Sequence, residues 1–90
     1  MSPGEFVYRE MRPGEERWVS ELIVRVFHKF ISARYPRSGV RDFLAYVSPA
    51  ALRERTLGDH RVLVAADGNK IVAAADVDSY NHIDLLFVDE

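Results

Sequence analysis

The sequence predicts an α+β domain with an N-terminal strand, two to three helices, and then a three-stranded antiparallel meander. Two observations predict this class. Apolar residues recur in pairs every four positions between residues 18 and 31, which is typical of an amphipathic helix. Three apolar segments, residues 61–66, 71–77 and 83–88, are separated by turn residues, which favours adjacent antiparallel strands. The 90 residues suffice for one small domain and are too few for two.

The first strand is expected at residues 6–11, where aromatic and β-branched side chains occur, and Pro13 and Gly14 follow it. A helix then begins near Glu15 and Glu16, because acidic residues suit the amino-terminal end of the helix dipole. Proline at position 36 ends the helical run at Tyr35. The apolar stripe of this helix is expected to contain Trp18, Val19, Leu22, Ile23, Val26, Phe27, Phe30 and Ile31.

Two shorter helices are expected next. Ser38 or Gly39 caps the first, whose apolar residues recur at helical spacing up to position 47. Ser48 caps the second, with Pro49 in its first turn. Gly58 ends this helix as a residue of left-handed conformation.

The meander begins with the continuous apolar run at residues 61–66, which predicts a strand covered on both faces. A tight turn at residues 67–70 leads to its antiparallel partner at 71–77, and a second turn at 78–81 leads to the final strand. In that strand alternation places Ile83, Leu85 and Phe87 on one side. The other side is expected to contain His82, Asp84, Leu86 and Val88.

Composition excludes several functional classes. A net charge of −2 gives no electrostatic basis for nucleic-acid or acidic-membrane partners. The sequence has no cysteine, so disulfides and thiolate chemistry are excluded, and its three scattered histidines predict no metal site. The amino terminus has no secretory pattern, and no apolar segment has the length of a membrane span, so we expect a cytoplasmic protein.

The predicted order of elements, with Leu86-Phe87-Val88 in the last strand, resembles the amino-terminal half of a GNAT-superfamily N-acetyltransferase. The segment at residues 39–49 also resembles a bacterial subgroup of that superfamily. The resemblance implies a partial GNAT fold, in which residues 1–90 form a single domain equivalent to an incomplete N-terminal half. It implies acetyl-CoA as the co-substrate and transfer of its acetyl group to a primary amine.

The sequence departs from the family pattern after the last strand. In the family, an arginine- and glycine-rich loop follows this strand, and its backbone N–H groups bind the pyrophosphate of coenzyme A. None of the glycines at positions 4, 14, 39, 58 and 68 lies in such a loop. The resemblance therefore implies a truncated acetyltransferase that does not turn over alone, and its binding of acetyl-CoA is itself open to question.

The resemblance also implies site residues. The backbone of Leu86, Phe87 and Val88 would contact acetyl-CoA, as in family members. His82 lies about where some members place a general base, six residues before the signature valine, and imidazole can accept a proton at neutral pH. Asp84 would orient His82 or replace it. Alternatively, His82 is hydrogen-bonded to the neighbouring turn and Asp84 is a solvated strand residue.

Aromatic residues around the junction of the first two helices would line the acceptor pocket by resemblance. Phe30 and Tyr35 are the candidates, with Phe43 beside them. Aromatic residues at helical spacing are commonly part of the core, so a packing role is the alternative.

A second hypothesis is a non-catalytic interaction domain derived from the same fold. Its last strand, residues 83–88, would pair with another chain, and self-pairing would give a homodimer through this C-terminal strand. A third hypothesis is an unrelated small α/β domain that binds a ligand and shares only the order of elements. The acceptor amine, whether a small molecule or a peptide, cannot be read from the sequence.

Overall fold

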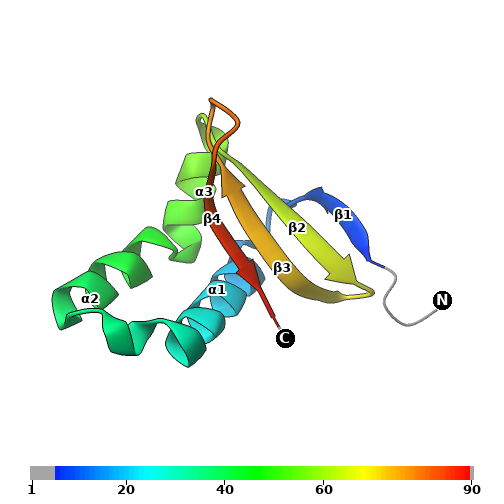
Figure 1. Cartoon of the computed structure of the whole chain (residues 1–90). Coiled ribbons are helices and arrows are strands. Elements are labelled where there is room, and N and C mark those ends of the chain that lie inside the picture. Colours follow the sequence, from blue (N-terminus) through cyan, green and yellow to red (C-terminus); the bar gives the residue numbers. More distant parts are fainter. Residues whose placement is uncertain (1–5, 90) are drawn as a thin grey trace.

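The computed structural model describes residues 6–89, which form a four-stranded sheet with helices on one of its faces (Figure 1). This architecture confirms the predicted α+β class and the partial GNAT fold. The elements in chain order are β1 (Val7–Glu10), α1 (Glu16–Phe30), a short 3-10 helix η1 (Ser32–Arg34), α2 (Arg37–Tyr46), α3 (Pro49–Leu57), β2 (Arg61–Asp67), β3 (Lys70–Val77) and β4 (Ile83–Val88).

The sheet is antiparallel throughout, and its strands lie in sequence order, β1-β2-β3-β4. The turn between β2 and β3 contains Gly68 at φ +62°, a conformation that glycine adopts without steric cost. The turn between β3 and β4 contains Asn81, also at φ +62°. The predicted meander is therefore confirmed, and β1 joins it at the edge of β2.

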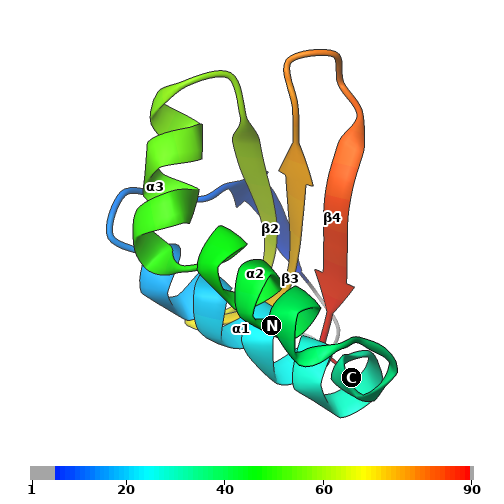
Figure 2. The same ribbon diagram turned by 90° about the vertical axis from the view of Figure 1, so that its left-hand side faces the viewer.

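The three α-helices lie on the same side of the sheet (Figure 2). The core between them and the sheet is formed mainly by α1, whose apolar side chains face the strands. Phe27 is 1% exposed and its ring stacks on that of Phe43 at 4.3 Å between centroids. Two residues of the predicted stripe, Trp18 and Phe30, lie at the ends of α1 and are largely exposed. The core residues from the helices and from the position that follows α2 are Val19, Leu22, Ile23, Val26, Phe27, Val47 and Leu52.

The caps of the shorter helices agree with the prediction in part. Ser48 caps α3, and its Oγ accepts a hydrogen bond from the backbone N–H of Ala51 at 3.2 Å. The predicted cap of α2 at Ser38 or Gly39 is wrong, because the extended residue Pro36 precedes a helix that already includes both positions. Gly58 is not left-handed, since its φ is −105° and its N–H bonds the carbonyl of Arg55.

The second face of the sheet carries no helix among residues 6–89 (Figures 1 and 2). Leu63 points to this face and is 36% exposed, so the prediction that both faces of β2 are covered is wrong for the described chain. The alternation of faces is interrupted between Ala65 and Ala66, where the pairing with β3 shifts in register. Both alanines are buried, which lengthens the apolar run of β2.

Candidate active site

The outer edge of β4 carries free backbone groups. Beyond its end, Asp89 donates its N–H to the carbonyl of Val72 in β3 at 2.8 Å. Because backbone groups of successive strand residues alternate in direction, the N–H and C=O groups of Leu86 and Val88 point away from β3. These two residues therefore present hydrogen-bonding groups along an edge that no other described strand covers.

Side chains around these groups anchor the strand. Phe87 is 7% exposed and packs toward the helices, with its ring 5.8 Å from that of Phe43. Leu86 and Val88 point to the uncovered face and are more than half exposed. The three residues predicted to contact acetyl-CoA thus form a strand with a fixed position and an accessible backbone.

A β-bulge interrupts β4 near its start. Asp76 and Val77 of β3 face Leu85 and Ile83, so Asp84 has no partner in the register. Because the bulge breaks the alternation of faces, Ile83 is 62% exposed, although the sequence predicted it on the same side of the strand as Leu85 and Phe87. Asp84 instead brings its Oδ2 to 3.9 Å from Nδ1 of His60.

His82 lies in the turn before β4, and its side chain is 76% exposed. Its Nδ1 is 3.9 Å from Oδ2 of Asp78, whose Oδ1 accepts the backbone N–H groups of Tyr80 and His82. These hydrogen bonds, that from His82 foremost, hold the pKa of Asp78 below its ordinary value. Within residues 6–89 the side chain of His82 thus contacts Asp78, and it is His60 that neighbours Asp84.

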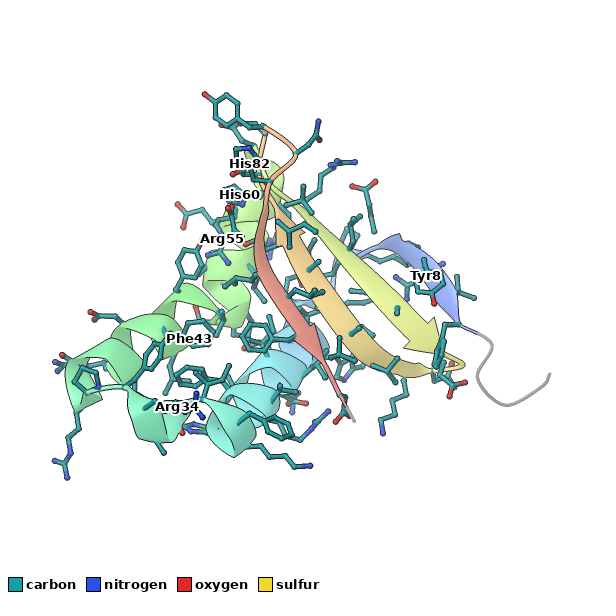
Figure 3. All side chains as sticks on the ribbon, in the orientation of Figure 1. Tyr8, Arg34, Phe43, Arg55, His60 and His82 are labelled. Atoms are coloured by element: carbon teal, nitrogen blue, oxygen red, sulfur yellow. The ribbon has the colours of Figure 1, made fainter. Side chains whose placement is uncertain are left out.

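His60 and Arg55 lie near each other at the end of α3 (Figure 3), and both contact a buried carboxylate. Asp76 of β3 is 3% exposed, and its Oδ1 lies 2.7 Å from Nδ1 of His60. Its Oδ2 accepts a hydrogen bond from Nε of Arg55 at 3.0 Å. Arg55 also donates to the carbonyl of Tyr46 at 2.6 Å and stacks on its ring, while its buried Nη2 has no partner among the described residues. This cluster joins α3 to the strands.

The sequence did not predict this cluster. The histidines are scattered in the sequence and predict no metal site, and Asp76 lies 16 positions from His60 along the chain. The signal that could have found it is Asp76 itself, the single acid inside an apolar strand. In the predicted hairpin around residues 67–70, that acid falls opposite the start of the preceding strand.

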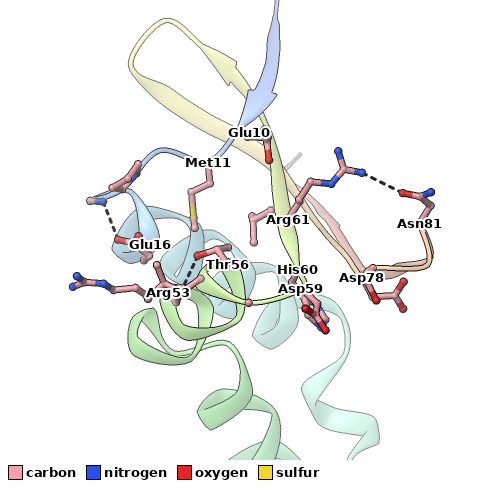
Figure 4. Close-up of a pocket in the computed structure, with 16 residues that line it drawn as sticks. Glu10, Met11, Glu16, Arg53, Thr56, Asp59, His60, Arg61, Asp78 and Asn81 are labelled. Carbon is pink, nitrogen blue, oxygen red and sulfur yellow. Dashed lines mark hydrogen bonds between the residues drawn. The ribbon is translucent and has the colours of Figure 1, made fainter.

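The cavity beside His60 has a volume of about 750 Å³ and is shown in Figure 4. It lies between the β1–α1 connection, the end of α3 and the β3–β4 turn. Charged groups of both signs line it, including Arg53, Asp59, Arg61 and Asp78. The cavity can therefore hold a polar or charged group next to the imidazole.

The residues predicted to bind the acceptor lie elsewhere. Tyr35 lines a second cavity of about 470 Å³ at the junction of α1, η1 and α2, and its ring packs edge-on against Phe27. Phe30 is 48% exposed at the end of α1 and does not line that cavity. Phe43 stacks on Phe27 and packs against the core, which agrees with the alternative that this aromatic residue has a packing role.

No helix within residues 6–89 has the length and apolar character needed to cross a membrane. No group of three or more His, Cys, Asp or Glu side chains in the same residues has a geometry suited to a metal ion.

Comparison with known proteins identifies the family. The model of the acetyltransferase (GNAT) domain matches residues 24–90, which is more than half of the chain. No curated protein matches the sequence closely enough to be reported as a relative. The matched region extends from the middle of α1 to the end of the chain and includes β4 and both histidines near it. The chain therefore belongs to the GNAT family of acetyltransferases.

Proposed function

We propose that this chain provides the β4 wall of an acetyl-CoA-dependent N-acetyltransferase that acts on a primary amine. The observation that carries the proposal is the pair of outward N–H groups at Leu86 and Val88, in a strand matched by the family model. Acetyl-CoA supplies the acetyl group as an activated thioester. Its pantetheine arm contains amide groups, which suit pairing with a strand edge in the manner of an added strand.

Most of the predicted site residues have a role in this proposal. Leu86 and Val88 donate backbone N–H groups to the co-substrate, and the buried ring of Phe87 fixes their position. Tyr35 contacts the acceptor from the second cavity, which Phe30 does not line. His82 and Asp84 are the proton acceptors predicted from the sequence, and both are accessible to solvent.

The 90 residues alone are proposed to give no turnover. The arm of acetyl-CoA fits the free edge of β4, whereas none of the glycines lies in a phosphate-binding loop. A substrate held along one wall only is poorly positioned, and positioning contributes a large share of the rate of a bimolecular reaction. Steady acetylation of any amine by the purified chain would overturn this part of the proposal.

The edge is tested by thermal unfolding with and without acetyl-CoA. Leu86→Pro removes the outward N–H and spares the hydrogen bonds to β3, since proline is tolerated where an edge N–H faces solvent. Leu86→Ala is the matched control, because it shortens the same side chain and keeps the N–H. At ten times Kd, binding stabilises a protein by about 1.4 kcal/mol. We expect this gain in the wild type and in Leu86→Ala, and its loss in Leu86→Pro. Equal gains in both variants would contradict the proposal.

A second candidate function is self-association through β4. It is favoured by the position of this strand at the sheet edge and by the apolar side chains on the uncovered face. Tyr8 is 77% exposed there, and Leu63, Leu86 and Val88 are exposed beside it. An open edge next to an apolar face favours pairing with a second copy.

Sedimentation velocity over a range of concentrations tests this candidate. Leu86→Lys places a charge on the edge strand, where lysine opposes pairing, and is expected to give a monomer. Leu57→Lys changes an equally apolar, 79% exposed position in α3 and should leave a dimer intact. A monomeric wild type at high concentration, or a dimeric Leu86→Lys, would exclude the homodimer.

A further inference from the structure

The hydrogen bond between His60 and Asp76 determines which nitrogen of the imidazole carries a proton. A carboxylate only accepts hydrogen bonds, so Nδ1 of His60, 2.7 Å from Oδ1 of Asp76, is the donor. Asp76 is held in place from its other oxygen by Nε of Arg55 at 3.0 Å. Neutral His60 therefore has its lone pair on Nε2, and the ring is fixed in one orientation.

The Nε2 atom is available to a ligand. It has no hydrogen-bond partner among residues 6–89. It is also accessible to solvent, because Nη2 of Arg55 is the one fully buried side-chain atom of these residues that lacks a partner. The side chain of His60 is 22% exposed and lines the cavity of about 750 Å³ (Figure 4). A lone pair that is oriented by a buried carboxylate and open to a cavity is the arrangement expected of a general base.

Asp84 connects this base to β4. Its Oδ2 lies 3.9 Å from Nδ1 of His60, because the β-bulge turns it out of the regular alternation. Leu86, the first residue with an outward N–H, is two positions further along the strand, or about 7 Å. An amine of a few atoms' length can span this distance. Asp84 and Asp76 both have a carboxylate oxygen within 4 Å of Nδ1 of the imidazole.

We propose that His60 is the general base for the acceptor amine, with Asp76 and Arg55 as positioning residues. The inference rests on the proposed function. In the step, one N–H bond of the acceptor's ammonium group breaks, and its proton forms a new bond to Nε2 of His60. The amine keeps the electron pair and becomes a neutral nucleophile. The imidazolium later returns the proton to solvent. His82, the base predicted from the sequence, has no buried carboxylate to orient its ring.

The test uses p-nitrophenyl acetate, because hydrolysis of this ester reports a basic, accessible imidazole and needs no coenzyme A. In the reaction the lone pair of Nε2 adds to the ester carbonyl, p-nitrophenolate leaves, and water then hydrolyses the acetyl-imidazole to acetate and the free ring. His60→Asn keeps an N–H donor toward Asp76 and removes the basic nitrogen. It is expected to lower the histidine-dependent rate about tenfold. His28→Asn makes the same change at an exposed histidine of α1 that has no orienting carboxylate in the described chain, and should lower the rate less than His60→Asn does.

Two results would overturn the inference. One is an unchanged rate in His60→Asn, and the other is loss of the rate in His82→Asn instead. A second measurement, ¹⁵N NMR of the histidine rings in the 90-residue protein, is expected to find the proton of neutral His60 on Nδ1. A proton on Nε2 would contradict the orientation given by Asp76. Failure of these tests is separate from failure of acetyl-CoA to bind the β4 edge, which the Leu86 variants measure.

Discussion

Glu15 connects β1 to the start of α1. Both of its oxygens accept hydrogen bonds from the guanidinium of Arg9 at 2.8 Å, and Oε1 also accepts the backbone N–H of Arg12 at 2.8 Å. These interactions, that with Arg9 foremost, lower the pKa of Glu15 to about 2. Bidentate pairs of this kind are stronger than single surface ion pairs.

Replacing Glu15 should destabilise the fold in a pH-dependent way. The pKa of Glu15 is about 2 in the folded protein and 4.5 ordinarily. The stabilisation by its charge is therefore complete above pH 4.5 and is lost as the pH falls toward 2. We expect Glu15→Gln to lower the free energy of unfolding by about 1–2 kcal/mol at pH 7. The loss should shrink near pH 2. Urea denaturation at both pH values measures it.

Glu10→Gln is the control for this measurement, because Glu10 is an exposed carboxylate in β1, the strand that also contains Arg9. Its substitution should change the stability little at either pH. A loss in Glu15→Gln that is the same at pH 2 and pH 7 would mean that the charge of Glu15 does not contribute to stability.

Single residues near the site show what the sequence could not supply. Asp78 lies in the predicted turn at 78–81 and His82 directly follows that turn, so their contact follows from local geometry. The contact between His60 and Asp76 depends on the register of a hairpin, and that between His60 and Asp84 depends on a bulge. A bulge leaves no sequence pattern of its own here, so the second contact could not be predicted.

At the scale of elements, α1 decides how much of the core is formed. The sequence predicted its apolar stripe but not which members of the stripe are buried. Trp18 is 58% exposed, whereas Leu22, one turn later, is 1% exposed. Composition alone favours burying tryptophan, so the exposure of Trp18 could not be predicted from the sequence.

Leu22→Ala and Trp18→Ala therefore form a matched pair. The first leaves a cavity between α1 and the sheet and should lower the free energy of unfolding by about 2–5 kcal/mol. The second removes a larger but exposed side chain and should cost less than about 1 kcal/mol. Chemical denaturation of both variants provides the comparison. A larger loss for Trp18→Ala would show that the packing of α1 has been assigned to the wrong face.

At the scale of the whole molecule, the sheet has one covered and one uncovered face among residues 6–89. The order of strand, helices and meander followed from the sequence because each element has a strong local pattern. The uncovered face could not be predicted, since small residues such as Ala65, Ala73 and Ala75 are compatible with a covered face and with an uncovered one. They form the floor of a hollow of about 490 Å³ that also includes Tyr8 and Leu86.

This asymmetry explains why both proposed functions use β4. The strand lies at the sheet edge, carries free backbone groups, and borders the uncovered face. A co-substrate and a second copy of the chain would compete for the same hydrogen-bonding groups. Acetyl-CoA is therefore expected to shift any dimer toward the monomer, because a ligand that binds one form shifts the equilibrium toward it.

The most direct measurement is an NMR titration of the ¹⁵N-labelled protein with acetyl-CoA, in which every backbone amide is followed. We predict that the resonances of Leu86 and Val88 move most and that those of β1, at the opposite edge, stay in place. Because both edges belong to the same sheet, β1 is an internal control. Larger shifts at β1 than at β4, or no shift at Leu86 and Val88 at saturating acetyl-CoA, would contradict the assignment of β4 as the wall that binds the co-substrate.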